Sequence, residues 1–413
     1  RGLIQNCTPG IFSIENNKIT LYTGLDPTSD SLHIGNLLPI SILIHFKNAG
    51  HNPLIIIGGA TAMIGDPSDK NTERQLLDNN IIEYNINSIK SQLYNFLDIY
   101  PNGRIKLLNN YDWIKNISFL NFVRNIGKYI TINYMIAKDY VKKRLNNCNG
   151  MSFTEFTYQL IQGYDFFYLY KTKNCLLQIG GSDQWGNIIT GIELIKKKLS
   201  GIAYGLTVPL ITKNDGSKLG KTKKGTNIWL NPKRTSPYKF YQFWLNISDN
   251  EAEKFIKYYT FLSKFEIEQL IIKHRKSPNK RLLQKKIASE ITKWIHGNNA
   301  YEKAVNTSEI LFSKNIDELK KINKDLSIFN GVPNLEINKE FLEKGITIVD
   351  VLVTLSNFLS SKNAVYRLIH SKAILVNKTI IYENLCLTTN DLIDERFILI
   401  QISKKNFFVI KVI

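Results

Sequence analysis

Cysteine is scarce in this 413-residue chain, which contains only four, and they lie far apart in the sequence. Cys7, Cys148, Cys175 and Cys386 form no CxxC pair and have no histidine pair nearby. This spacing argues against a structural zinc site and against a disulfide framework, and it favours a reducing compartment. The six histidines show no metal-ligand spacing either, so we expect no metal site built by the protein.

Long apolar runs are also absent. The best candidate, residues 37–46, is interrupted and falls short of the ~20 residues that a membrane-spanning helix needs. We therefore expect no membrane segment and no membrane partner. The composition, with 43% hydrophobic and 22% charged residues, is typical of a soluble globular protein, and the length allows two or three domains.

Acidic residues are outnumbered by basic ones. There are 54 Lys and Arg against 35 Asp and Glu, which gives a formal net charge of +19 and an isoelectric point near 9.5. A surplus of this size attracts polyanions and predicts nucleic-acid binding. The alternative explanation is codon bias, because Lys, Asn and Ile are abundant, as an AT-rich genome favours.

The organising motif is the stretch TLYTGLDPTSDSLHIGNLLPI, residues 20–40. Strand-forming residues end at Asp26-Pro27, and a helical apolar pattern begins after Ser31, which is placed as the helix N-cap. The pattern predicts a strand, a loop and a helix in that order.

His33, Gly35 and Asn36 fall on the first turn of that helix. Unpaired backbone N–H groups and the helix dipole favour a phosphate there. Gly35 lets a planar ring approach the backbone closely, while the imidazole and the amide add hydrogen bonds. We interpret the turn as a nucleotide site, although strand–loop–helix units with a glycine also occur in proteins of other functions.

Further strands are predicted at residues 53–57, 105–108, 175–179 and 206–211. The first of these ends in a glycine pair that leads to Asp66. The third leads to Ser182 and Asp183, either of which is placed to cap the next helix. Strands alternating with helices over residues 19–212 predict an α/β fold with a doubly wound parallel sheet, which binds ligands at the carboxyl ends of its strands.

Residues 153–172 carry a long helical pattern that is dense in aromatic residues. Tyr158, Gln162 and Asp165 stand at i, i+4 and i+7, so they share one face. A phenol, an amide and a carboxylate among apolar neighbours form either a buried polar site or a half-exposed surface stripe. The periodicity alone leaves both open.

The loop after the last predicted strand contains KLGKT, residues 218–222. Together with Gly216 it is similar to a P-loop, but only three residues separate its glycines, and a P-loop follows the first strand of its fold. We therefore reject a P-loop NTPase. Instead, HIGN and KLGKT together resemble the paired HIGH and KMSKS signatures of class I aminoacyl-tRNA synthetases.

Flanking motifs narrow this resemblance. YTGLDPTSDSLHIGN, GGATAMIGDPSDK and QIGGSDQWGNI are similar to the bacterial and organellar type of tyrosyl-tRNA synthetase. The resemblance implies a Rossmann-like catalytic domain that joins L-tyrosine to ATP, giving tyrosyl-adenylate and pyrophosphate. The tyrosyl group then passes to the terminal ribose of tRNA(Tyr). Mg²⁺ enters with ATP as part of the substrate.

The resemblance also implies a role for each site residue. Those implied to hold the β- and γ-phosphates during catalysis are Thr28, His33, Asn36, Lys218 and Lys221. Those implied to contact ATP or the adenylate are Asp26, Gly35, Gly181, Asp183, Gln184 and Thr222. Those implied to bind tyrosine are Tyr22, Asp66, Tyr158, Gln162, Asp165 and Gln178. Asn36 departs from the family, which usually has a histidine there, but an amide can donate the same hydrogen bond.

The order of domains follows from the same resemblance and from a change of pattern beyond Pro237, where helices continue without strands. We expect a catalytic domain at 1–236 with a helical dimer-interface insertion at about 110–150, an α-helical anticodon-binding domain at 237–312, a linker at 313–344 and a small α+β S4-like RNA-binding domain at 345–413. The implied partners are tRNA(Tyr) and a second copy of the chain, and not DNA.

Two alternative functions differ from this one. Tryptophanyl enzymes share the two signatures but are not expected to carry Tyr22 together with Asp165. A synthetase-derived RNA-binding protein without catalysis is favoured if lysines or carboxylates of the site are missing. All four of these residues are present, namely Lys218, Lys221, Asp165 and Asp183.

The compartment is inferred from three features. The chain begins at Arg1 rather than Met, so we expect that an upstream segment has been removed, and any targeting peptide would belong to it. With the bacterial type and the AT-rich codon usage, this favours a plastid, apicoplast or mitochondrion, and otherwise the cytoplasm.

Overall fold

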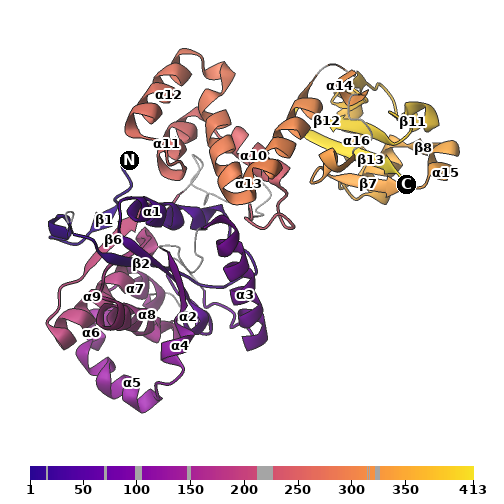
Figure 1. The fold of residues 1–413 in the computed structure, drawn as a ribbon. Coiled ribbons are helices and arrows are strands. Elements are labelled where there is room, and N and C mark those ends of the chain that lie inside the picture. The colour runs from indigo at the N-terminus through magenta and orange to yellow at the C-terminus, as the bar shows by residue number, and fades with distance from the viewer. Residues whose placement is uncertain are drawn as a thin grey trace. The chain divides into compact units, whose positions relative to one another are not determined.

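The computed structural model describes residues 1–14, 17–68, 72–97, 105–146, 150–211, 227–313, 315, 317–320 and 326–413. Contacts divide these residues into two compact units. The first unit comprises residues 1–234 and 247–287, and the second comprises residues 235–246 and 288–413 (Figure 1).

A six-stranded sheet forms the centre of the first unit. Its strands are β1 (Asn6–Cys7), β2 (Thr20–Leu25), β3 (Asn52–Ile57), β4 (Lys106–Asn109), β5 (Cys175–Gly181) and β6 (Tyr204–Val208). Their order across the sheet is β1-β6-β5-β2-β3-β4. All neighbours pair in parallel except β1, which lies antiparallel to β6 at one edge. The predicted parallel α/β fold is therefore confirmed.

Helices cover the sheet because its strands are apolar on both sides, as the fully buried run Leu54–Ile57 of β3 illustrates. The helices that follow the strands are α1 (Leu37–Asn48), α2 (Gly59–Ala62), α3 (Asn79–Phe96), α8 (Phe153–Lys173) and α9 (Trp185–Leu199). Helices α8 and α9 pack against each other and against β5, while α1 packs on β2 and β3. Helix α8 begins at Ser152, whose hydroxyl accepts the Glu155 N–H.

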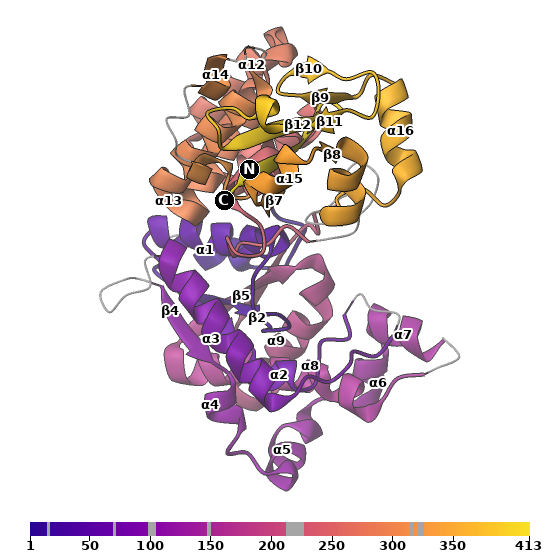
Figure 2. The ribbon, with the colours of Figure 1, turned by 90° about the vertical axis from the view of Figure 1, so that its right-hand side faces the viewer.

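An insertion of short helices lies between β4 and α8. It contains α4 (Tyr111–Ile114), α5 (Phe119–Asn125), α6 (Ile132–Ile136) and α7 (Asp139–Leu145). In Figure 2 this magenta segment projects from the sheet, with α5 at its far end. The first unit also contains α11 (Asp249–Tyr259) and α12 (Lys264–Lys276), each of which begins with a Ser-x-x-Glu capping box.

The order of the parallel strands reverses between β2 and β5. Chain order runs from β2 outward to β3 and β4 on one side, and then from β5 to β6 on the other. Open α/β sheets bind ligands where such a reversal opens a crevice at the carboxyl ends of the strands. The topology therefore points to the loops after β2 and β5.

Two predicted helix caps are wrong. Ser31 does not cap the first helical turn, because the His33 side chain does so and the Ser31 hydroxyl instead accepts a hydrogen bond from the Asn231 N–H. Neither Ser182 nor Asp183 caps α9. Both residues lie in a 3₁₀ turn, Ser182–Gln184, that leads directly into the helix.

The second unit contains helices and a separate sheet. Its helices are α10 (Pro237–Leu245), α13 (Leu282–Phe312, from residue 288 on), α14 (Asp317–Lys320), α15 (Lys339–Glu343) and α16 (Lys362–His370), with a π-helical turn at Asp350–Leu355. Its strands are β7 (Asn334–Ile337), β8 (Ile346–Thr347), β9 (Ile374–Val376), β10 (Thr379–Ile380), β11 (Cys386–Leu387), β12 (Phe397–Ile402) and β13 (Asn406–Val412).

The segment expected to be an irregular linker is partly folded. Strand β7 pairs in parallel with β13 and completes a five-stranded sheet of order β10-β9-β12-β13-β7. Leu342 of α15 is buried in the core of that sheet. Residues 334–343 therefore belong to the C-terminal fold, which corrects the linker expectation for this part. Among the residues that the structure describes, no helix is long and apolar enough to cross a membrane.

Candidate active site

Two unsatisfied polar groups lie at the point where the strand order reverses. Tyr22 on β2 is in register with Gln178 on β5, and both side chains are buried. The Tyr22 hydroxyl and the Gln178 Oε1 atom have no hydrogen-bond partner among the described residues. Buried polar groups are normally paired, so this arrangement fits a polar ligand that supplies the missing partners.

Asp165 of α8 is held by two donors from the residues that follow β4, Asn110 and Trp113 of α4. The Trp113 Nε1–H donates to Oδ1 at 2.8 Å, and the Asn110 Nδ2 amide donates to Oδ2 at 3.0 Å. The carboxylate is 4% exposed. Burial raises the pKa of Asp165 to about 7, although both hydrogen bonds oppose the rise. The polar face of α8 is therefore buried, and the surface alternative does not apply.

A second carboxylate, Asp26, is joined to Asp165 through shared partners. The Tyr158 hydroxyl donates to Asp26 Oδ2 at 2.8 Å, and the Thr61 hydroxyl donates to Oδ1 at 2.7 Å. Thr61 in turn accepts the Asn110 amide at 3.2 Å. Burial, followed by the charge of Asp66, raises the pKa of Asp26 to about 6.

Glycine is required beside this network. A Cβ atom on Gly58 would stand 2.0 Å from Asp26 Oδ1 and 2.2 Å from Thr61 Oγ1. The glycine pair after β3 therefore makes room for the hydrogen bonds that hold Asp26.

A third group of polar side chains connects the loop after β3 with the loop after β5. The Gln184 amide donates to Asp66 Oδ2 at 2.7 Å and to Asp183 Oδ2 at 3.2 Å. The Asn187 amide donates to Gln162 Oε1 at 2.9 Å and to Gln184 Oε1 at 3.3 Å. Asp66 also contributes to the raised pKa of Tyr158, the residue whose hydroxyl holds Asp26.

The HIGN turn, residues 33–36, is fixed by a reciprocal cap. The Gly35 N–H donates to His33 Nδ1 at 3.1 Å, and the His33 N–H donates to Asn36 Oδ1 at 3.0 Å. Burial lowers the pKa of His33, which keeps the ring neutral. Because Nδ1 accepts, the ring proton sits on Nε2, and both Nε2–H and the Asn36 amide hydrogens remain as donors.

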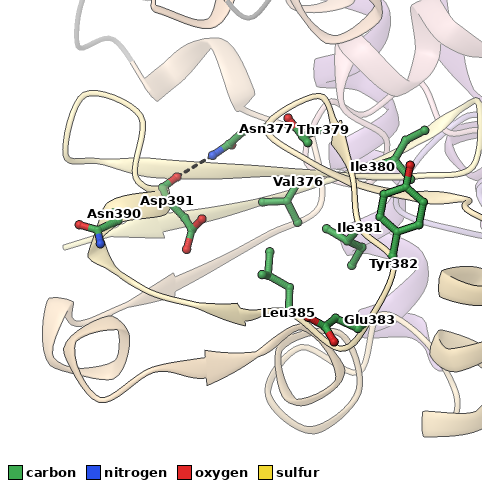
Figure 3. A pocket seen from close by; sticks show the side chains of 10 residues that line it. All are labelled: Val376, Asn377, Thr379, Ile380, Ile381, Tyr382, Glu383, Leu385, Asn390 and Asp391. Atoms are coloured by element: carbon green, nitrogen blue, oxygen red, sulfur yellow. Dashed lines mark hydrogen bonds between the residues drawn. The ribbon is translucent and has the colours of Figure 1, made fainter.

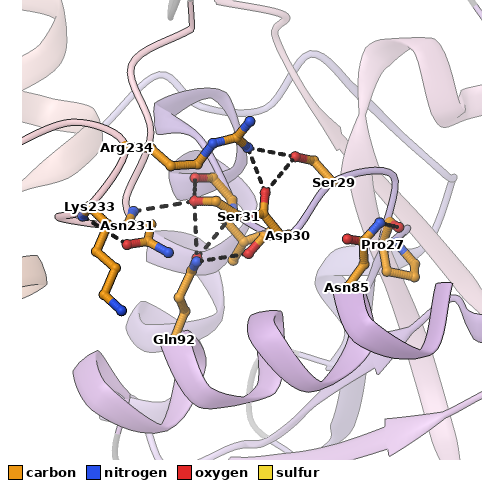
Figure 4. Close-up of polar contacts among 10 residues, drawn as sticks. Pro27, Ser29, Asp30, Ser31, Asn85, Gln92, Asn231, Lys233 and Arg234 are labelled. Carbon is orange, nitrogen blue, oxygen red and sulfur yellow. Dashed lines mark hydrogen bonds and ion pairs between the residues drawn. The ribbon is translucent and has the colours of Figure 1, made fainter. Parts of the chain in front are cut away.

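The segment that follows the KLGKT loop returns to this turn. Ile34 N–H donates to the Ile228 carbonyl at 3.1 Å, and Leu230 N–H donates to the Leu32 carbonyl at 2.8 Å. Figure 4 shows the neighbouring side-chain contacts, in which Asn231 and Arg234 meet residues 29–31. Lys218, Lys221 and Thr222 themselves lie outside the described residues, so their predicted roles stay predictions.

Most of the sequence-predicted residues that the structure describes gather at one place. Tyr22 and Gln178 lie in the middle of β2 and β5. Beyond the carboxyl ends of β2, β3 and β5 follow Asp26, Asp66, Asp183 and Gln184, and α8 carries Tyr158, Gln162 and Asp165. Gly181 ends β5, and His33, Gly35 and Asn36 form the turn before α1. Thr28 is exposed in the loop after β2, and no hydrogen bond joins its side chain to a site residue that the structure describes.

Sequence reasoning missed four side chains that hold these residues. Asn110, Trp113, Thr61 and Asn187 each pair with a predicted site residue. The available signal was position, since Asn110 directly follows β4 and thus lies at the carboxyl edge of the sheet.

A separate cavity of about 530 Å³ lies in the C-terminal sheet domain (Figure 3). Its lining includes Asn377, whose amide donates to the Asp391 carbonyl at 2.6 Å, and the side chains of Tyr382 and Glu383. Lys372 Nζ stands 5.3 Å from the centre of the Tyr382 ring, which is 68% exposed. None of the predicted site residues lines this cavity.

Comparison with known proteins gives matches over the whole chain. The family model described as tRNA synthetases class I (W and Y) matches residues 14–313, and the tyrosine–tRNA ligase SYY-like C-terminal domain matches residues 326–410. The tyrosine–tRNA ligase of Bacteroides fragilis is 51% identical over 99% of this chain and 97% of its own length. That of Flavobacterium psychrophilum is 52% identical over 100% and 97%.

A solved structure agrees with these matches. The C-terminally truncated mitochondrial tyrosyl-tRNA synthetase of Aspergillus nidulans is 30% identical, covers 75% of this chain and 92% of its own, and superposes with a TM-score of 0.68.

Proposed function

The chain belongs to the tyrosine–tRNA ligases, a family of class I aminoacyl-tRNA synthetases, and from this premise we propose how its own residues carry out the reaction. A carboxylate oxygen of L-tyrosine attacks the α-phosphorus of ATP, and the bond to pyrophosphate breaks. A ribose hydroxyl of tRNA(Tyr) then attacks the carbonyl carbon of the adenylate, and AMP leaves. Neither step needs a covalent enzyme intermediate, so the protein works by positioning and by stabilising charge.

Asp165 and Tyr22 receive the substrate phenol. The observation that carries this assignment is the buried Asp165 carboxylate, held by Asn110 and Trp113 in the unit that also contains the unsatisfied Tyr22 hydroxyl. Burial and then the charge of Asp165 raise the pKa of Tyr22, so Tyr22 stays protonated. Phenylalanine would leave these buried groups without a partner, and that penalty selects tyrosine.

The substrate ammonium is received by Asp66, Tyr158 and Gln162. The Tyr158 hydroxyl uses its proton on Asp26 and therefore has lone pairs left to accept an N–H. The Asp66 carboxylate supplies a charge-assisted bond. Asp26 and Gln184 lie towards the reacting carboxyl and the α-phosphate, and Gly181 and Asp183 towards the ribose.

The phosphates of MgATP are held by donors from the HIGN turn. His33 Nε2–H and the Asn36 amide are the donors that the reciprocal cap leaves over. Lys218, Lys221 and Thr222 add charge and hydrogen bonds as pyrophosphate forms, and Thr28 is assigned there by the family resemblance. Mg²⁺ arrives with ATP.

The decisive experiment is ATP–pyrophosphate exchange with each of the twenty amino acids, without tRNA. We expect exchange with tyrosine alone. Exchange with tryptophan instead would show that the protein is a tryptophan-specific relative. Folded protein that exchanges with no amino acid would favour the RNA-binding alternative.

The C-terminal fold binds tRNA(Tyr) through the exposed face of α16 and the neighbouring loop. Lys362, Arg367 and Lys372 are exposed there, and Tyr366 and Tyr382 offer rings on which bases can stack. Replacing Lys362, Arg367 and Lys372 by Ala should lower tRNA charging about tenfold and leave tyrosine exchange unchanged. Equal charging by this variant would contradict the RNA role.

The chain forms a homodimer through the insertion between β4 and α8. Phe119 and Leu120 on α5 are 67% and 77% exposed, and Ile132 on α6 is 59% exposed. Large apolar side chains exposed on one insertion support an interaction surface there. Leu120→Asp should shift the chain from dimer to monomer in sedimentation velocity, whereas Phe265→Asp, at an equally exposed position on α12, should not.

The proposal also covers the helices after residue 237, the C-terminal fold and the compartment. The helices between residues 237 and 312 bind the anticodon arm, and the S4-like fold extends to residue 413. We propose that the protein acts in an organelle. Imaging a fluorescent fusion of the full gene product would test this.

A further inference from the structure

Arg234 lies outside all the residue sets described above, yet it contacts both sides of the HIGN turn. Its guanidinium donates to the Asp30 Oδ1 atom at 2.6 Å and to the Ser29 hydroxyl at 2.8 Å (Figure 4). The same group lies over the Trp229 ring, with Cζ 3.9 Å from the ring centre. One side chain thus joins the loop before the turn to the segment that returns to it.

Trp229 also contacts His33, so it connects Arg234 to that residue. The two residues form an isolated antiparallel bridge, and their ring centres are 6.1 Å apart at an interplanar angle of 52°. The His33 ring is held on its Nδ1 side by the Gly35 N–H. The Trp229 ring is therefore a neighbour of the His33 ring, whose Nε2–H is the donor that the proposed function assigns to the phosphates.

Helix α3 holds the opposite side of the same loop. Gln92 accepts the Leu32 N–H at 3.1 Å and donates to the Asp30 carbonyl at 3.2 Å. Asn85 donates to the Pro27 carbonyl at 3.0 Å. These contacts fix the backbone on the α3 side, whereas the side chain of Asp30 and the ring of Trp229 are held by Arg234.

We propose that Arg234 is a positioning residue for ATP, acting through Asp30 and Trp229 on the His33 side chain. The inference rests on the proposed function of the HIGN turn. Arg234 touches no substrate. It sets where the Nε2–H of His33 stands, and a misplacement of such a donor lowers the rate of a reaction that depends on positioning.

The chemistry of the contact requires arginine. A guanidinium is planar, so it stacks on the indole while its edge donates to oxygen atoms. Lysine would keep the charge near Asp30 and lose the stacking. The pair is partly exposed, with 37% and 33% of the Arg234 and Asp30 side chains accessible, so its loss should affect the stability of the fold little.

The test is ATP–pyrophosphate exchange with tyrosine at varied ATP concentration, together with tyrosine affinity measured by equilibrium dialysis. Arg234→Ala should lower kcat/KM for ATP about tenfold, while tyrosine affinity stays within about twofold. Arg234→Lys should lose about threefold. Combining Arg234→Ala with Asp30→Asn should cost no more than Arg234→Ala alone, because both act through one contact.

The matched control is Arg275→Ala. Arg275 donates to both Glu253 carboxylate oxygens, at 2.7 and 2.6 Å, in the same unit and far from the turn in sequence. It should leave exchange unchanged. The inference is overturned if Arg234→Ala affects ATP kinetics no more than Arg275→Ala, or if it lowers tyrosine affinity and melting temperature in parallel. Absence of exchange by the unmodified chain would instead refute the proposed function itself.

Discussion

The proposed tyrosine end and the proposed phosphate end of the site are built by opposite means. At the tyrosine end, side chains from α2, α4, α8 and the residues that follow β2 and β4 hydrogen-bond to one another, and burial raises the pKa of both Asp26 and Asp165. At the phosphate end, a short turn offers partly exposed donors and is held from outside by Gln92 and Arg234. The difference indicates that substrate choice depends on desolvated groups, some paired within the protein and others, such as the Tyr22 hydroxyl, left for a ligand, whereas phosphate binding depends on the placement of a few donors.

The largest effect is expected at the buried carboxylate. Asp165→Ala removes the acceptor for the substrate phenol and leaves the Asn110 and Trp113 donors unpaired, so kcat/KM for tyrosine should fall about 100- to 1,000-fold. Pyrophosphate exchange measures this fall, and circular dichroism confirms the fold. Asp112→Ala, at an exposed position on α4, is the control. Unchanged activation kinetics would remove Asp165 from the site.

The next largest effect is expected at the phosphates. Lys221→Ala should slow adenylate formation about a hundredfold by removing a charge that stabilises pyrophosphate as it forms, with tyrosine affinity unchanged. Single-turnover kinetics would measure both quantities. Lys264→Ala, on the exposed surface of α12, serves as the control. If tyrosine affinity collapses while the saturated rate holds, the KLGKT loop has a different role.

A smaller effect is expected from one hydrogen bond at the tyrosine end. Trp113→Phe keeps an aromatic ring beside Tyr168, whose ring centre is 4.7 Å away, and removes only the N–H that donates to Asp165. Activation of tyrosine should fall about tenfold in kcat/KM, as expected for a bond to a buried charge. A fall equal to that of Asp165→Ala would mean that the substitution disrupts the pocket.

The same variant should shift a pH profile. Asp165 accepts the substrate hydroxyl only when ionised, and its pKa of about 7 predicts that kcat/KM for tyrosine falls as the pH drops below about 7. The Trp113 hydrogen bond lowers that pKa, so Trp113→Phe should move the midpoint to higher pH. A midpoint that stays in place would mean that the pH profile does not report the ionisation of Asp165.

The smallest effect is expected at the turn itself. Asn36→His restores the residue usual in this family and keeps one donor towards the phosphate and one acceptor for the His33 N–H. Exchange should remain within about threefold of the unmodified chain. Asn36→Ala, which loses both groups, should cost about tenfold. Equal effects of the two variants would show that the side chain only caps the turn.

The sequence was sufficient for features set by local pattern. Apolar runs such as residues 53–57 identified the parallel sheet, and the i, i+4, i+7 spacing of Tyr158, Gln162 and Asp165 placed them on one face of α8. Hydrogen bonds between residues far apart in the sequence could not be predicted from it. Asn110 and Trp113 reach Asp165 across more than fifty residues, and nothing in their own neighbourhood specifies that contact.

Competing hydrogen bonds explain the wrong N-cap prediction at Ser31. Ser31 has the chemistry of an N-cap, but the His33 and Asn36 side chains cap the turn two residues later, which leaves the Ser31 hydroxyl for Asn231.

Strand β7 is four residues long and only partly buried, and its partner β13 lies some seventy residues away. Its sequence signal is therefore weak, and only the tertiary pairing defines it.

The chain of hydrogen bonds from Tyr158 through Asp26, Thr61 and Asn110 to Asp165 has a consequence for redesign. An engineer who replaces Asp165 to admit a different amino acid also takes a partner from Asn110, which shares its amide with Thr61 and, through it, with Asp26. The proposed phenol end of the pocket and the proposed reacting end are thereby joined by hydrogen bonds. Altered specificity should consequently require compensating changes at residues that never touch the new side chain, and single substitutions should yield slow enzymes rather than selective ones.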